Sequence, residues 1–139
     1  MGCLQQAFWH CFLLHTTNGR TLEMTANHPD KSVFVVDDDA AIRDSLLWLL
    51  EPEGFNVKTF SNADDFLSFS SDSPPSPACL LLDIRMLGMS GIELQKTLLK
   101  QKNSIPIVFF TGHGTTPIAV QAIKDGAFDF IGKPFDDQH

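Results

Sequence analysis

The pattern that most restricts the fold of this chain is a repeated alternation, from Ser32 onward, of short apolar runs with amphipathic segments. Four of the runs are nearly all apolar, as expected for strands buried inside a parallel sheet that helices cover on both faces. The second run instead alternates polar and apolar residues, which is typical of an edge strand. The five predicted strands are residues 33–36, 56–60, 79–82, 107–110 and 128–131.

The segments between the runs carry the signals of helices. In the first, apolar residues recur three or four positions apart along one face, and Pro52 and Gly54 end the helix. Residues 70–77 are rich in serine and proline and are expected to form a loop. The starts of the other three helices are predicted at Ser61 with Asp64, at Gly91, and at Thr116 as the N-cap before Pro117.

Two parts of the chain fall outside this pattern. Residues 1–31 lack the strand–helix rhythm and are expected to be an N-terminal extension, either disordered or a single helix. Residues 32–139 are the predicted domain, which stops soon after its fifth strand, so we expect a truncated fifth helix. A helical extension would cover the apolar surface left by that truncation, in its own molecule or a neighbour's. Its apolar stripe would consist of Leu4, Ala7, Phe8, Cys11, Phe12 and Leu14, with Trp9 and Leu13 outside it.

Length and charge narrow the classes of function. A chain of 139 residues that is 43% hydrophobic can bury one core but is too short for two ordinary domains. The net charge of −7 disfavours direct binding of nucleic acid. The N-terminus lacks the basic region of a signal peptide, and there is no apolar run of membrane-spanning length. With Cys79 expected to be a buried free thiol, the sequence favours a cytoplasmic protein without membrane contact.

Acidic, hydroxyl and amine side chains follow the carboxyl ends of the predicted strands. They are Asp37 and Asp38 after the first strand, Asp83 after the third, Thr111 after the fourth and Lys133 after the fifth. In an open parallel sheet these ends line one crevice. Several carboxylates suit Mg²⁺, and a carboxylate can attack phosphorus when the phosphoryl charge is neutralised. The pattern therefore predicts an Mg²⁺-dependent phosphoryl acceptor, with Lys133 and Thr111 able to contact the phosphoryl oxygens.

Motifs around these residues resemble the receiver domains of two-component response regulators, in particular the FixJ-type subgroup. The resemblance covers roughly residues 32–138 and implies a flavodoxin-like, doubly wound parallel sheet of five strands in the order 2-1-3-4-5. The matching motifs, in chain order, are Val35-Val36-Asp37-Asp38-Asp39, Leu82-Asp83-Ile84-Arg85-Met86, Met89-Ser90-Gly91, Phe110-Thr111-Gly112-His113-Gly114 and Asp129-Phe130-Ile131-Gly132-Lys133-Pro134-Phe135.

The resemblance also implies roles and partners. The implied site consists of Asp83 as phosphoacceptor, Asp37, Asp38, Asp83 and the Arg85 backbone carbonyl as Mg²⁺ ligands, Lys133 and Thr111 as phosphate-binding residues, and Thr111 with Phe130 as the switch pair. A sensor histidine kinase would supply the phosphoryl group. The fourth helix and fifth strand could form a homodimer. Output would be control of transcription through a DNA-binding domain absent from this chain, and the domain would not be a turnover enzyme beyond slow self-dephosphorylation.

One departure and two alternatives accompany this interpretation. Leu87 stands where these receivers usually have proline, so the loop after Asp83 is expected to be less rigid. A receiver-like interaction module without phosphorylation is the first alternative. The second is an Mg²⁺-dependent phosphatase with an Asp nucleophile. Phosphatases of the haloacid dehalogenase type usually carry a second Asp two residues after the nucleophile as general acid and base, and Arg85 occupies that position here.

Overall fold

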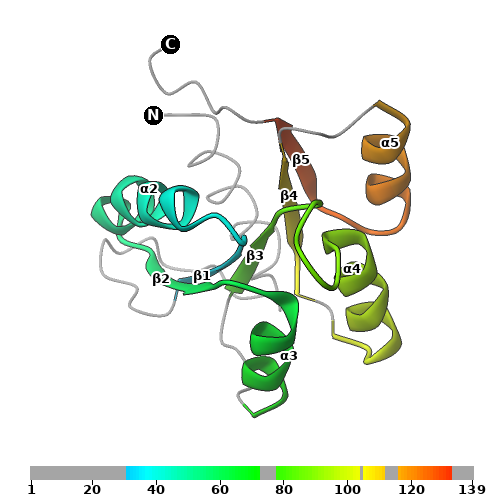
Figure 1. Ribbon diagram of the computed structural model, residues 1–139, viewed down its shortest axis with the longest axis horizontal. Coiled ribbons are helices and arrows are strands. Elements are labelled where there is room, and N and C mark those ends of the chain that lie inside the picture. The colour runs from blue at the N-terminus through cyan, green and yellow to red at the C-terminus, as the bar shows by residue number, and fades with distance from the viewer. Residues whose placement is uncertain (1–30, 73–77, 104, 112–115, 133–139) are drawn as a thin grey trace, which may run out of the picture.

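A computed structural model describes residues 31–72, 78–103, 105–111 and 116–132 (Figure 1). Its five strands form one sheet, all paired in parallel, in the order β2-β1-β3-β4-β5. The predicted strand order is therefore confirmed. The strands are β1 (Ser32–Val36), β2 (Asn56–Phe60), β3 (Ala78–Leu82), β4 (Ile107–Thr111) and β5 (Asp129–Gly132). The helices are α2 (Ala40–Leu50), the 3₁₀ turn η1 (Glu51–Glu53), α3 (Ala63–Asp72), α4 (Gly91–Lys100) and α5 (Thr116–Lys124).

The burial of each strand follows its sequence pattern. All five residues of the central strand β3 are buried, whereas burial in β2 alternates along the strand, with Asn56 and Lys58 exposed. The expectation that residues 56–60 form an edge strand is thus confirmed. The Lys58 ammonium group lies 5.2 Å from the centroid of the Phe69 ring in α3, so this edge carries a cation over an aromatic face.

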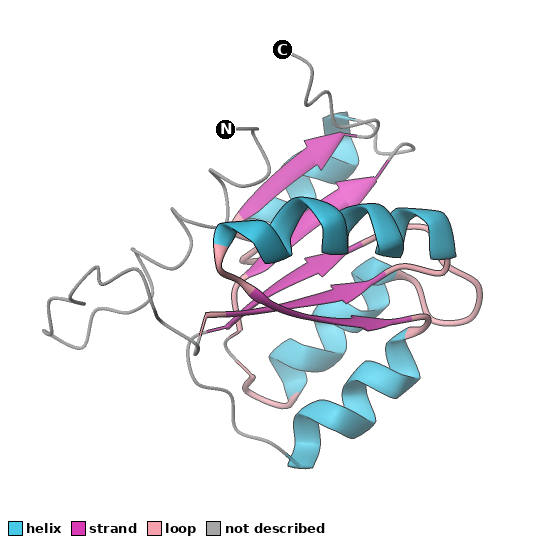
Figure 2. Cartoon of the chain, turned by 90° about the vertical axis from the view of Figure 1, so that its left-hand side faces the viewer, coloured by secondary structure: helices cyan, strands magenta, loops and turns pink. Residues whose placement is uncertain are grey.

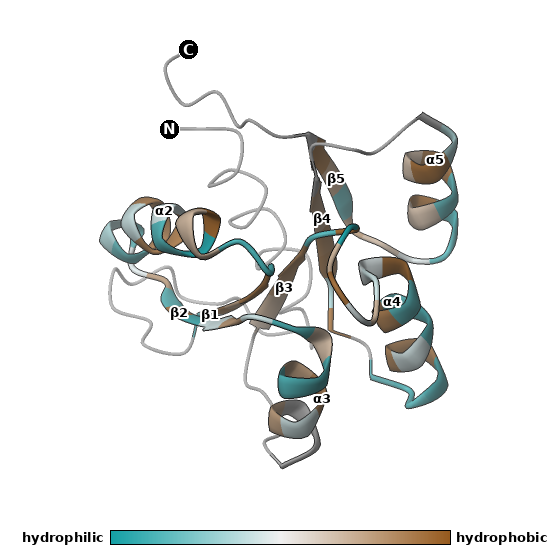
Figure 3. Ribbon diagram, in the orientation of Figure 1, coloured by the Kyte–Doolittle hydropathy of each residue, from teal (hydrophilic) through white to brown (hydrophobic). Residues whose placement is uncertain are grey.

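Successive side chains of the strands point to opposite faces and divide the core into two clusters. One contains Val33 and Val35 of β1 together with Leu46 of α2; we call this side of the sheet the α2 face. The other contains Phe34 and Val36 of β1 with residues from α3, α4 and α5. Figures 1 and 2 show these layers, and Figure 3 shows the apolar strands between them. The predicted cover of helices on both faces is confirmed.

The helix boundaries confirm some of the sequence predictions and correct others. The 3₁₀ turn containing Pro52 follows α2, and Gly54 ends it with a φ of 94°, as expected. The predicted cap of α3 at Ser61 is wrong, because the Asp65 amide donates to Asn62 Oδ1 at 2.8 Å. That helix also continues to Asp72, into the predicted loop. The first helical residue of α5 is Thr116, which was expected to be its N-cap.

Cys79 departs from expectation in its chemistry. It is buried in β3, as predicted, but it is disulfide-bonded. The expectation of a free thiol is therefore wrong, and the cysteine no longer argues for a reducing compartment. Residues 1–30 and 133–139 lie outside the described residues, so the expected N-terminal extension and truncated fifth helix stay predictions. None of the described helices is long and apolar enough to cross a membrane.

Candidate functional site

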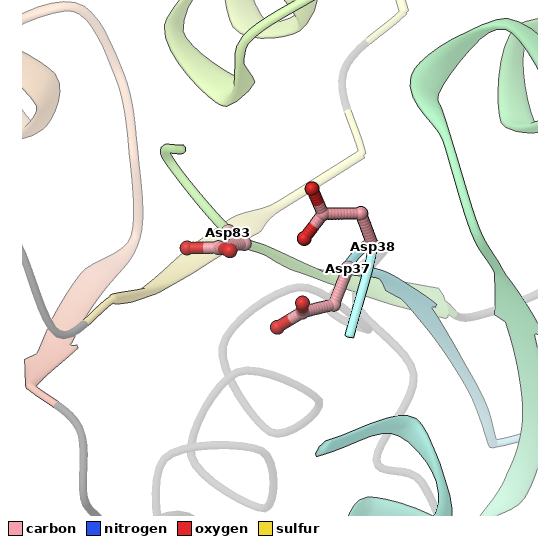
Figure 4. Close-up of side chains that lie close together, drawn as sticks. All are labelled: Asp37, Asp38 and Asp83. Carbon is pink, nitrogen blue, oxygen red and sulfur yellow. The ribbon is translucent and has the colours of Figure 1, made fainter. Parts of the chain in front are cut away.

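The three aspartates predicted as metal ligands lie together at the carboxyl-terminal end of the sheet (Figure 4). Asp37 and Asp38 directly follow β1, and Asp83 directly follows β3. Since Val36 and Leu82 are paired in the ladder between β1 and β3, the next residues of both strands emerge side by side. One carboxylate oxygen from each acid lies within 4.8 Å of the others. Asp37 and Asp83 are buried, whereas Asp38 is exposed, so the cluster is open to solvent on one side.

Backbone hydrogen bonds continue the sheet one residue into this site. The Asp83 amide donates to the Val36 carbonyl at 3.1 Å, and the Asp37 amide donates to the Phe60 carbonyl at 3.2 Å. The Arg43 guanidinium of α2 donates from Nη1 to the Asp37 carbonyl at 2.7 Å. The side chain of Asp37 is oriented as well, because its Oδ1 accepts from the Asp39 amide at 2.9 Å. Asp37 is therefore held by the sheet, by α2 and by the loop that follows it, and the Asp83 backbone is held by the sheet.

The loop after Asp83 contacts the acidic cluster through its backbone. The Leu87 amide donates to Asp38 Oδ2 at 3.1 Å, while the side chain of Leu87 is 85% exposed. Proline has no amide hydrogen and cannot make this bond. Sequence reasoning saw Leu87 as a departure that loosens the loop and missed this contact, although the presence of an amide-bearing residue in place of proline was the available signal.

The end of the same loop is fixed by the start of α4. Ser90 and Glu93 form a capping box, in which Ser90 Oγ accepts from the Glu93 amide at 3.2 Å and Glu93 Oε1 accepts from the Ser90 amide at 2.9 Å. The Gly91 amide donates to the Ile84 carbonyl at 2.9 Å. A Cβ atom on Gly91 would clash with the carbonyl oxygen of Asp83. Only glycine therefore allows α4 to begin so close to the candidate phosphoacceptor.

The other predicted site residues are placed to different extents. Thr111 ends β4, where its backbone pairs with Gly132 at the same carboxyl-terminal end of the sheet as the aspartates. Phe130 of β5 is half-buried, and its ring centroid lies 6.2 Å from that of Phe109. Arg85 is exposed in the loop after Asp83. Lys133 follows β5 and lies outside the described residues.

The acidic cluster suits a small, hard cation. Mg²⁺ takes oxygen ligands at about 2.0–2.1 Å in octahedral geometry, which separates two ligand oxygens on one ion by roughly 3–4 Å. The separations of up to 4.8 Å between the Asp37, Asp38 and Asp83 oxygens are slightly wider. A small inward movement, or a water molecule in place of one direct ligand, closes that difference. Because Asp38 is exposed, the waters that Mg²⁺ retains can reach the cluster from this side.

A parallel sheet in this strand order, with acids from two neighbouring strands gathered at its carboxyl end, is the arrangement of a signalling receiver. This chain belongs to the response regulator receiver domain family, whose model matches residues 33–139. Both the suspected family and the flavodoxin-like fold class are thereby confirmed.

Individual relatives support the FixJ-type resemblance. The chain is 49% identical over 107 residues to the transcriptional regulatory protein FixJ of Bradyrhizobium diazoefficiens, covering 76% of this chain and 50% of that protein. It is 41% identical over 117 residues to the transcriptional regulatory protein TdiR of Thauera aromatica, covering 84% and 51%. The crystal structure of FixJ-N matches with a TM-score of 0.70 and 45% identity, covering 78% of this chain and 86% of that one. The chain spans about half the length of the curated relatives it matches.

Proposed function

We propose that this receiver domain accepts a phosphoryl group on Asp83 from a sensor histidine kinase, in the presence of Mg²⁺. The observation that carries the proposal is the convergence of Asp37, Asp38 and Asp83, with oxygens within 4.8 Å of one another, at the carboxyl ends of β1 and β3. Together with the backbone carbonyl of Arg85, these acids would hold the ion. Bound Mg²⁺ would neutralise charge on the three carboxylates and on the phosphoryl oxygens.

The residues of the chain would divide the remaining chemistry among them. One Asp83 oxygen forms a bond to phosphorus while the bond from phosphorus to the donor breaks, and the donor group leaves with that electron pair. Lys133 neutralises further phosphoryl charge, and the hydroxyl of Thr111 donates to a phosphoryl oxygen. Amide groups of the loop after Asp83 are available to the remaining oxygen. The product is an aspartyl phosphate and not a released molecule.

The signal would then travel toward α5 and β5. We propose that movement of Thr111 to the phosphoryl group lets Phe130 change its rotamer, since these residues lie in the paired strands β4 and β5. A homodimer through the α5–β5 surface would report this change. Such a domain switches state and does not turn over substrate, apart from slow loss of its own phosphate. Arg85, in the position where a phosphatase would need a second Asp, supports this assignment.

Relatives suggest the wider context. FixJ and TdiR are named transcriptional regulatory proteins, and each is about twice as long as the part that this chain matches. We propose that residues 32–139 are a receiver that controls transcription through a separate DNA-binding domain, with no nucleic acid or membrane bound by the receiver itself. The boundary is supported by β1, which begins at Ser32. A cytoplasmic location fits phosphoryl transfer from a histidine kinase, and the Cys79 disulfide would then form only under oxidising stress.

The proposal is tested by incubating the protein with Mg²⁺ and acetyl phosphate and measuring intact mass. We expect one phosphoryl group that is stable in acid and labile in base, lost in Asp83→Asn. Asp44→Asn is the matched control, because Asp44 is an exposed acid outside the cluster and its loss should leave phosphorylation unchanged. An unphosphorylated wild type, or full phosphorylation of Asp83→Asn, would contradict the assignment.

A further inference from the structure

Part of the α2 face is buried without a described element over it. On this face Val108 and Phe110 of β4 and Ile131 of β5 are 0%, 1% and 9% exposed. Among the described elements, α2 alone lies on this face, and its main strand contact is with β2, at the far edge of the sheet from β5 (Figure 1). Apolar side chains on an uncovered face of a sheet would contact water. Their burial therefore requires cover from another part of the same chain.

The disulfide of Cys79 indicates which part supplies that cover. Cys79 belongs to the cluster on the α2 face and lies in β3, next to β4. The chain contains three cysteines, and the other two are Cys3 and Cys11. The bonded partner of Cys79 must therefore come from the first 31 residues. Such a bond would link an N-terminal segment to the buried face.

We propose that residues 4–14 form an amphipathic helix that packs in its own molecule on the α2 face of β3, β4 and β5. Its apolar stripe, described above, recurs at three- and four-residue intervals and would contact Val108, Phe110 and Ile131. Cys11 lies within that stripe, whereas Cys3 lies at its margin. Cys11 is therefore assigned as the partner of Cys79.

Chain length permits this packing within one molecule. Lys31 precedes β1, the neighbour of β3, and its carbonyl accepts from the Asn56 amide at 2.8 Å. Residues 15–31 lie between the proposed helix and this point and can extend roughly 55 Å at about 3.3 Å per residue. This reach exceeds the width of a five-stranded sheet, with strands about 4.8 Å apart. A second copy of the chain is not needed to supply the helix.

Apolar packing and the disulfide are separable in this proposal. The helix docks through its apolar stripe in the reduced protein. The disulfide forms when the Cys11 and Cys79 thiols exchange with one molecule of oxidised glutathione, which yields the protein disulfide and two molecules of reduced glutathione. The inference does not depend on phosphorylation of Asp83.

The packing is tested by paired substitutions in the full chain, melted under reducing conditions. Phe8→Asp places a charge in the stripe, and Leu13→Asp makes a comparable change outside it. We expect Phe8→Asp to lower the melting temperature by roughly 5–10 °C and Leu13→Asp by about 1 °C or less. Equal melting temperatures for the two variants would overturn the proposal. A circular dichroism spectrum of each variant below its melting point establishes that the sheet domain remains folded.

The pairing is tested by oxidising the wild type with glutathione disulfide and mapping its peptides by mass without reduction. We expect a linked pair containing Cys11 and Cys79 from a monomeric protein, lost in Cys11→Ser and kept in Cys3→Ser. A Cys3–Cys79 pair would overturn the assignment of Cys11, the residue within the stripe, as the partner of Cys79. A linked dimer would overturn the assignment to the same molecule.

Discussion

At the scale of single residues, the amide of Leu87 offers a test of how the acidic cluster is oriented. It donates to Asp38 Oδ2 at 3.1 Å, which leaves Oδ1 of the same carboxylate available to an ion. Leu87→Pro removes this donor, and we expect it to weaken Mg²⁺ binding by about 1 kcal/mol, or roughly fivefold in Kd. Isothermal titration calorimetry of the metal-free protein with Mg²⁺ measures the change in Kd.

Leu87→Ala is the matched control, because it removes an exposed side chain and keeps the amide. Its Kd for Mg²⁺ should equal that of the wild type. If Leu87→Pro instead bound Mg²⁺ more tightly, the amide would be a competitor of the ion and not an orienting group.

Some residue-scale features could be read from the sequence and others could not. The three aspartates were identifiable because each follows an apolar run, and parallel strands bring such positions together. The cap of α3 was misassigned because Ser61 and Asn62 are adjacent and both side chains can cap, so only the backbone conformation chooses between them. The role of the Leu87 amide was hidden because loop geometry decides which amide meets Asp38.

At the scale of elements, the start of α4 controls the position of the candidate phosphoacceptor. Gly91→Ala would force its new Cβ against the Asp83 carbonyl and so displace either the helix or the loop. We expect a loss of about 2 kcal/mol in the free energy of unfolding, typical of an overpacked site, with a clear fall in phosphorylation rate. Urea denaturation and the acetyl phosphate assay measure the two effects.

Gly126→Ala separates stability from site geometry. Gly126 has a φ of 112° with open space around its Cβ position, so alanine there is strained by its backbone alone. The variant should lose about 1–2 kcal/mol of stability yet keep the wild-type phosphorylation rate. A similar loss of phosphorylation in both variants would show that general destabilisation, and not displacement of Asp83, is responsible.

Elements were predictable to the extent that they have their own sequence signals. All five strands were located to within one residue, because four read as continuous apolar runs and the edge strand β2 alternates polar and apolar residues. The start of α4 at Gly91 was predicted, whereas the capping box of Ser90 and Glu93 was missed, although its spacing is a local sequence signal. The extension of α3 to Asp72 was not predicted, since serine-rich segments favour loops by propensity.

At the scale of the whole molecule, an ion that binds only the folded state must stabilise it. Mg²⁺ at about ten times its Kd should add about 1.4 kcal/mol to the free energy of unfolding and raise the melting temperature by roughly 3–6 °C. Addition of excess EDTA should reverse the shift. Differential scanning fluorimetry across a Mg²⁺ series measures it.

Asp38→Asn should reduce the Mg²⁺-dependent shift sharply, because it removes a charged ligand from the cluster. Asp44→Asn provides the control at constant net charge, and its shift should match that of the wild type. An undiminished shift in Asp38→Asn would mean that the ion binds elsewhere on this acidic protein.

The cation on β2 has a consequence for how sheets of neighbouring molecules can join. Fibril growth by strand addition requires an available edge strand on both sides of the sheet in each molecule. The edge strand β2 carries Lys58, and an incoming strand would have to approach this charged group, which lies over the Phe69 ring. Strand addition at the β2 edge is therefore disfavoured, which works against fibril growth of this kind.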